Sequence, residues 1–102
     1  MGKWVPVAKV NDLKPNQCVH VPIENKELVL FNVDGKFYAL DDACTHAGAS
    51  LAEGSCEAGV VTCPRHGATF DIKTGEALSD PAPEGVVTYP VKVDGENVLI
   101  EI

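Results

Sequence analysis

The chain has 102 residues, of which 45% are hydrophobic and 23% charged, a composition typical of one globular domain. Its formal net charge of −7 argues against the basic surface that nucleic acids or anionic membranes require, so we expect neither as a partner. The chain has no run of 18 apolar residues, and its start lacks the apolar segment of a secretory signal. These features predict a cytoplasmic protein, whose acidic balance suits either solubility or docking to a basic protein partner.

The first clear strand is expected over residues 18–23, where side-chain types alternate along the chain. This alternation places Val19, Val21 and Ile23 on one face of the strand. Cys18 and His20 fall on the other face. We therefore interpret His20 as an outward-facing strand residue and not as a metal ligand.

Two β-hairpins are predicted, one on each side of the middle of the chain. The first joins residues 27–33 to residues 36–40 through Asp34-Gly35, a pair that supplies the positive φ angles of a type I′ turn. The second joins residues 86–93 to residues 97–102 around Asp94-Gly95-Glu96. No stretch of a dozen residues keeps a helical period, although one helical turn near residues 49–53 is compatible with the sequence. The chain is thus predicted to be all-β.

Residues 42–83 are irregular and rich in Gly, Cys, His and Pro, which indicates loops organised by something other than a large apolar core. They contain two mixed clips, Cys44-Thr45-His46 and Cys63-Pro64-Arg65-His66, separated by the 16 residues from Ala47 to Thr62. Within each clip a thiolate and an imidazole are close enough for one loop to direct both at a shared metal centre. The sequence therefore predicts a four-ligand metal site.

The pattern C-x-H followed by C-x2-H at this separation resembles the Rieske motif. Gly48 and Gly67 match the C-T-H-x-G and C-P-x-H-G loops of that family. Residues 80–83, Asp-Pro-Ala-Pro, resemble its third, proline-rich loop, while Phe70-Asp71 and Thr74-Gly75 fit the strand and turn after the second clip. The resemblance covers essentially the whole chain.

This resemblance implies one [2Fe-2S] cluster per chain, with the inner iron held by Cys44 and Cys63. The outer iron, near the surface, would be held by His46 and His66. The implied fold is a Rieske-type antiparallel β sandwich with an inserted cluster-binding subdomain. We expect a single domain over residues 1–102, with base layers at about 1–42 and 84–102 and the cluster-binding subdomain at about 43–83.

A Cys2His2 zinc site is the main alternative for the metal, because it uses the same four ligand types. A zinc finger usually pairs Cys with Cys and His with His, whereas both clips here are mixed. We therefore favour the cluster over zinc. Cys18 and Cys56 lie outside the motif, and we interpret them as thiols in preference to metal ligands or a mutual disulfide.

Two thiolates leave an oxidised [2Fe-2S] centre neutral, whereas four would leave it with a charge of −2. An electron enters a neutral centre more easily, so the reduction potential should lie in the Rieske window of roughly −150 to +300 mV. The high-potential relatives of respiratory complexes add a disulfide between the two loops, a hydroxyl donor and a tyrosine. At those positions this chain has Ala49, Arg65, Ala68 and Phe70. These differences predict a reduction potential at the low end of the Rieske window.

No spacing typical of a catalytic acid, base or nucleophile is present, so the chain is expected to be an electron carrier and not an enzyme. The resemblance implies a ferredoxin that passes electrons from a flavin-dependent ferredoxin reductase to a terminal, ring-hydroxylating-type oxygenase. Such a carrier would be a monomer that forms transient complexes. The alternative is a fixed small subunit of a larger oxidoreductase such as assimilatory nitrite reductase, and a zinc-stabilised interaction module ranks third.

Overall fold

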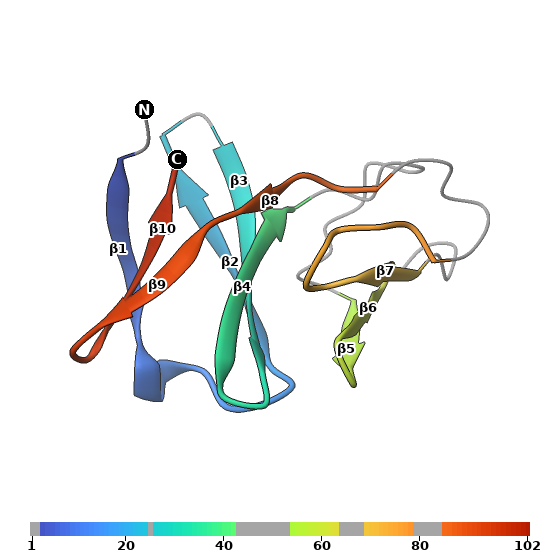
Figure 1. Cartoon of the computed structure of the whole chain (residues 1–102), viewed down its shortest axis with the longest axis horizontal. Coiled ribbons are helices and arrows are strands. Elements are labelled where there is room, and N and C mark those ends of the chain that lie inside the picture. The colour runs from blue at the N-terminus through green and yellow to red at the C-terminus, as the bar shows by residue number, and fades with distance from the viewer. Residues whose placement is uncertain (1–2, 25, 43–53, 64–68, 79–84) are drawn as a thin grey trace.

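The computed structural model describes residues 3–24, 26–42, 54–63, 69–78 and 85–102 (Figure 1). A single short 3-10 helix, Val10–Asp12, occurs in these ranges. The strands, in chain order, are β1 Trp4–Lys9, β2 Cys18–Ile23, β3 Lys26–Val33, β4 Lys36–Asp41, β5 Ser55–Glu57, β6 Val60–Thr62, β7 Thr69–Asp71, β8 Thr88–Tyr89, β9 Val91–Asp94 and β10 Asn97–Glu101. No helix in the described part is long and apolar enough to cross a lipid bilayer.

The strands form three antiparallel sheets. The outer sheet has the order β1-β10-β9, the central sheet β2-β3-β4-β8 and the small sheet β5-β6-β7. Figure 1 shows the outer sheet on the left, the central sheet in the middle and the small sheet on the right. This arrangement confirms the prediction of an all-β protein built from antiparallel strands.

From Leu28 onward, strand β3 is buried on both faces because the central sheet is covered on both sides. Leu28 and Leu30 belong to an apolar cluster that includes Val98 and Ile100 of the outer sheet. The alternate residues of β3 face a second cluster, here called the inner cluster: Val29, Phe31, Val33, Leu40, Val61, Cys63, Phe70, Ile72 and Val86. A strand covered on both faces must be apolar at consecutive positions, and this explains the unbroken apolar run from Leu28 to Phe31.

The β3–β4 hairpin forms as predicted, with Val33 paired to Lys36. Asp34 has a φ of 52° and Gly35 a φ of 90°, the two positive values that a type I′ turn requires. The buried Asn32 side chain fixes the turn: its Nδ2 donates to the Leu13 carbonyl at 2.8 Å, and its Oδ1 accepts from the Gly35 amide at 2.8 Å. These two hydrogen bonds satisfy the polar atoms of the buried Asn32 side chain.

The prediction of one strand over residues 86–93 was wrong. The structure has two strands there, β8 paired with β4 and β9 paired with β10, separated by Pro90. Proline has no amide hydrogen to continue a ladder, so the chain passes from the central sheet to the outer sheet at this residue. The following turn contains two residues, Gly95-Glu96, because Asp94 already pairs with Asn97.

Strand β2 occupies residues 18–23 as predicted, but only part of its apolar face is covered. Val21 and Ile23 are buried, whereas Val19 is 41% exposed because β2 is the edge strand of the central sheet. Strands β5 and β6 lie in the region that the sequence marked only as irregular. The helical turn expected near residues 49–53 lies outside the described residues.

Candidate metal centre

Of the four predicted ligands, Cys63 lies in the described part of the chain. Cys44, His46 and His66 lie outside it, as does the proline-rich segment 80–83, so the complete ligand set stays a prediction. Among the described residues, no three His, Cys, Asp or Glu side chains form a group that could hold a metal ion. The structure therefore tests the site through Cys63 and through the residues that flank the two clips.

Cys63 directly follows strand β6 and is 1% exposed. Its side chain belongs to the inner cluster, together with Val61 of β6 and Phe70 of β7. These apolar neighbours exclude water and provide a low local dielectric around the sulfur. Burial of this kind suits a ligand of an inner iron, the role that the Rieske resemblance implies for Cys63.

The small sheet holds both ends of the segment that carries the second clip. Thr62 pairs with Thr69 across β6 and β7, and these two residues flank positions 63–68. Ser55 also pairs with Thr62, which brings the end of the first-clip segment to the same sheet. Leu78 donates its amide to the Thr69 carbonyl at 2.8 Å, so the chain two residues before the proline-rich segment joins the same sheet.

Two further backbone hydrogen bonds connect the other flanks, one of them to the central sheet. Asp41, the last residue of β4, donates its amide to the Val87 carbonyl at 2.9 Å. Val86 donates to the Gly75 carbonyl at 2.7 Å, which links the residues after the proline-rich segment to the turn after β7. The residues that flank the two clips and the proline-rich segment are therefore connected by one network of backbone hydrogen bonds.

Gly75 is required for this connection. Its φ is +77°, and a Cβ built on it would lie 2.2 Å from the Val86 carbonyl oxygen. Only glycine permits both the left-handed conformation and such a close backbone approach. The predicted turn at Thr74-Gly75, after strand β7, is thus confirmed.

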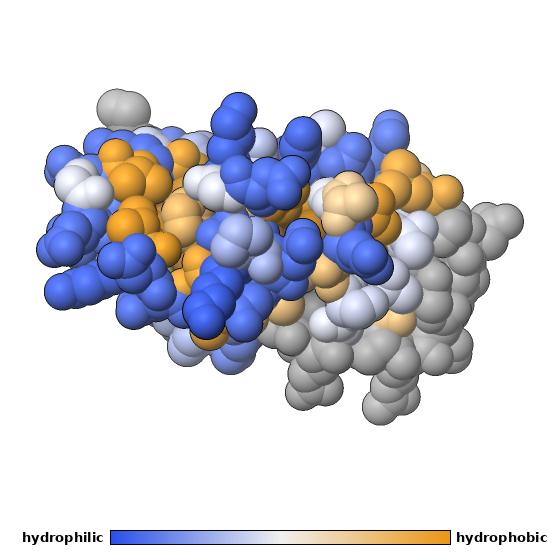
Figure 2. Space-filling view, turned by 90° about the horizontal axis from the view of Figure 1, so that it is seen from below, coloured by the Kyte–Doolittle hydropathy of each residue, from blue (hydrophilic) through white to orange (hydrophobic). Residues whose placement is uncertain are grey.

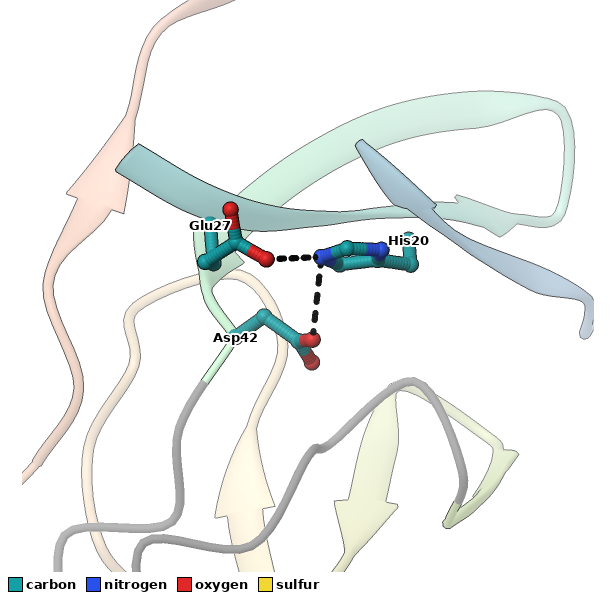
Figure 3. Close-up of polar contacts among 3 residues, drawn as sticks. All are labelled: His20, Glu27 and Asp42. Atoms are coloured by element: carbon teal, nitrogen blue, oxygen red, sulfur yellow. Dashed lines mark hydrogen bonds and ion pairs between the residues drawn. The ribbon is translucent and has the colours of Figure 1, made fainter. Parts of the chain in front are cut away.

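His20 belongs to a small polar cluster beside the start of the first-clip segment (Figure 3). Its Nε2 lies 2.8 Å from Glu27 Oε1 and 3.7 Å from Asp42 Oδ2. Asp42 is buried and comes two residues before Cys44. The partly exposed ring lies on β2, as predicted, but sequence reasoning missed its two carboxylate neighbours because no motif connects these distant positions.

A second polar contact stabilises the end of β4. The Tyr89 hydroxyl hydrogen bonds to the Asp41 carboxylate, joining β8 to β4 through side chains as well as backbone. Burial raises the pKa of Tyr89, and the negative charge and hydrogen bond of Asp41 raise it further. Tyr89 therefore stays a neutral donor throughout the physiological pH range.

The donor set, the buried position of Cys63 and the joined flanks all fit a two-iron centre held by two thiolates and two imidazoles. The family model for the Rieske [2Fe-2S] domain matches residues 3–90. The chain belongs to this family, and the predicted resemblance is confirmed. It carries a [2Fe-2S] cluster and not the zinc site that was the main alternative.

Three comparisons place the chain within the family. It is 37% identical over 100 residues, 98% of this chain and 96% of the relative, to the ferredoxin component of the naphthalene 1,2-dioxygenase system of Pseudomonas aeruginosa. A solved complex of reduced oxygenase and oxidised ferredoxin in carbazole 1,9a-dioxygenase matches with a TM-score of 0.92 and 33% identity over 95% of this chain and 91% of that one. A structure described as a nitrite reductase NADPH small subunit matches with a TM-score of 0.83 and 26% identity over 96% and 97%.

Proposed function

We propose that this chain is the ferredoxin of a multicomponent oxygenase system, located in the cytoplasm. It accepts one electron from a flavin-dependent ferredoxin reductase and passes it to a terminal, ring-hydroxylating-type oxygenase. The observation that carries this proposal is the 37% identity to a dioxygenase ferredoxin component over nearly the full length of both chains. That relative is an electron-transfer component, which agrees with the expectation that this chain is not itself an enzyme.

The proposed ligand set consists of the four side chains of the two clips, Cys44, His46, Cys63 and His66. When bound, the cluster supplies reversible one-electron chemistry. The chain supplies a scaffold: β6 presents Cys63 inside the inner cluster, and the hydrogen-bonded flanks hold the loop ends in place. A rigid environment of this kind limits reorganisation when the charge at the site changes, and such a limit favours fast electron transfer.

A fixed small subunit of a nitrite reductase is the alternative function. The 26% identity to a protein of that description, with a TM-score of 0.83, supports a shared fold and a shared domain family. Both the identity and the TM-score are lower than for the carbazole dioxygenase ferredoxin complex. We therefore favour the mobile carrier.

Reconstitution tests the proposal. The purified holoprotein is mixed with the reductase and the terminal oxygenase encoded beside its gene, and oxygenase turnover is followed while the amount of this protein is varied. We expect turnover to require the protein and to continue through many cycles when it is present at far less than one copy per oxygenase. Co-purification in a stable one-to-one complex with a large nitrite-reducing subunit would overturn it.

A further inference from the structure

Two cysteines outside the predicted ligand set lie together where the central sheet meets the small sheet. Cys18 begins β2 and Cys56 is the middle residue of β5. Their side chains hydrogen bond to each other, and both pack against the inner cluster. Both are thiols in this structure. Two sulfurs from different sheets are therefore already in contact.

The hydrogen bonds around the pair orient both sulfurs. The Cys56 thiol donates to the Asn16 carbonyl at 3.0 Å, while the Cys18 thiol donates to the Cys56 sulfur. Asn16 lies in the turn before β2, so the contact connects β5 to the chain just before the central sheet. Because the two thiols are already hydrogen bonded, forming a bond of about 2.05 Å requires a local movement of the two side chains and of the β5 edge.

We propose that Cys18 and Cys56 are a reversible disulfide site that links the small sheet to the central sheet by exchange with a small-molecule disulfide of the glutathione type. This proposal is independent of the identity of the electron partners. It concerns cysteines that the family motif does not use, and it assigns a covalent state to a contact that the structure shows as two thiols.

The exchange balances in two steps. The Cys56 thiolate attacks one sulfur of the small disulfide, forms a mixed disulfide and releases one small thiolate. The Cys18 thiolate then attacks the Cys56 sulfur and releases the second small thiolate. Overall, the two protein thiols lose two protons and two electrons, and one small disulfide is reduced to two small thiols.

The order of attack follows from the surroundings of the two thiols. The pKa of Cys18 is raised to about 12, mainly by burial and also by the charge and hydrogen bonding of Cys56 and by the charge of Asp42. Burial also raises the pKa of Cys56, but the hydrogen bond from Cys18 offsets part of this increase. Cys56 is therefore the first attacking thiol and Cys18 the resolving one. Because thiolates are scarce at neutral pH, exchange is slow and requires a sustained oxidising environment.

The disulfide would act on the part of the fold that presents Cys63. Strand β5 pairs with β6, and β6 ends directly before Cys63. A covalent bond from β5 to β2 restrains the small sheet against separation from the central sheet. We expect the oxidised form to lose its cluster more slowly on heating than the reduced form does.

Mass spectrometry tests the disulfide directly. The holoprotein is equilibrated anaerobically with oxidised glutathione, quenched in acid, alkylated while denatured and digested. We expect a monomer in which Cys44 and Cys63 are alkylated and the Cys18 and Cys56 peptides are cross-linked. A wild-type protein with all four cysteines alkylated, with glutathione retained on Cys56, or with a disulfide between two chains would overturn the proposal.

Two variants distinguish the steps and provide controls. Cys18→Ser removes the resolving thiol, so glutathione should remain attached to Cys56, whereas Cys56→Ser should leave Cys18 unmodified. Thermal bleaching of the visible cluster absorption should be at least about twofold slower in oxidised than in reduced wild type, with no such difference in Cys18→Ser. Equal bleaching rates in the oxidised and reduced wild type would overturn the role of the disulfide in linking the two sheets. If a variant fails to fold, the peptide map of the wild type alone shows whether the disulfide forms.

Discussion

At the scale of single residues, the histidine ligands can be tested one at a time. His46→Ala or His66→Ala removes one of the four predicted ligands, so neither variant should retain a stable cluster. The parent protein should contain about two iron and two acid-labile sulfide per chain and no stoichiometric zinc. Iron and sulfide analysis, with visible absorption, measures both expectations.

The control for this experiment is His20→Gln. His20 lies on β2 and its Nε2 contacts Glu27, so a glutamine keeps a polar group there without affecting any predicted ligand. This variant should keep its full iron and sulfide content. Loss of the cluster in His20→Gln together with retention in His66→Ala would show that the ligand assignment is wrong.

Phe70 offers a test of how the chain sets the reduction potential. It is fully buried in the inner cluster that contains Cys63. Phe70→Tyr adds a hydroxyl donor, which stabilises the more negative reduced centre and should raise the potential by ~60 mV, about a tenfold shift in a one-electron equilibrium. Redox titration measures the change, and Phe70→Leu, which adds no donor, should not raise the potential. A potential that rises equally in both variants would assign the effect to packing.

At the scale of secondary-structure elements, two glycines with similar backbone angles differ in their surroundings. Gly75 has a φ of +77° and would place a Cβ 2.2 Å from the Val86 carbonyl oxygen. Gly35 has a φ of +90°, and its Cβ would meet no atom within 4 Å. Comparison of Gly35→Ala with Gly75→Ala therefore separates the cost of backbone strain from the cost of a steric clash with neighbouring backbone.

We expect Gly35→Ala to lower the apparent free energy of unfolding by about 1 kcal/mol, the cost of a left-handed alanine. Gly75→Ala should cost more than about 2 kcal/mol, because it must also displace the backbone that joins the flanks of the proline-rich segment. Anaerobic denaturant titration of both holoproteins measures the difference. Equal losses would show that the close approach at Gly75 contributes nothing to stability.

The hairpin strands could be predicted because their signals are local. Asp34-Gly35 specifies the first turn by its φ preferences, and the apolar run beside it reports a strand covered on both faces. Pro90 was present in the sequence, but its effect depends on which strands lie beside it, and local sequence does not give that. Strands β5 and β6 have three residues each, too few to show a period.

The metal site divides in the same way. The Cys and His clips were visible because ligand identity and spacing are local properties, whereas the hydrogen bond from Asp41 to Val87 joins residues that are far apart in the sequence. The contact of His20 with Asp42 and that of Cys18 with Cys56 have the same origin. Each pair is brought together by the pairing and packing of sheets, so no sequence motif could reveal it.

At the scale of the whole molecule, apolar surface is distributed unevenly. Figure 2 shows hydrophobic residues near both ends of the visible face, with a mainly hydrophilic region between them. Two exposed apolar side chains, Leu78 at 47% and Val87 at 57%, lie on either side of the proline-rich segment. With a net charge of −7, such a surface suits transient association with a partner that carries the opposite charge.

The last prediction follows from this charge. If the protein shuttles between a reductase and an oxygenase, the rate at low protein concentration is limited by encounter, and encounter between opposite charges slows as salt screens them. Turnover in the reconstituted system should therefore fall steadily as ionic strength rises. A fixed subunit would already be bound, and its rate would not fall in this way.

Two charge-reversal variants locate the effect. Glu76→Lys changes an exposed residue beside the turn at Gly75, and Glu96→Lys changes an exposed residue in the β9–β10 turn, so both shift the net charge from −7 to −5. Glu76→Lys should slow turnover several-fold at low salt and weaken its salt dependence, because Glu76 lies close to the flanks of the predicted cluster loops. Glu96→Lys, on the distant hairpin, should have a much smaller effect. Equal effects of the two variants would show that total charge, and not a local docking face, sets the encounter rate. If salt had no effect on turnover with the wild type or with either variant, the proposal of a shuttling carrier would be contradicted.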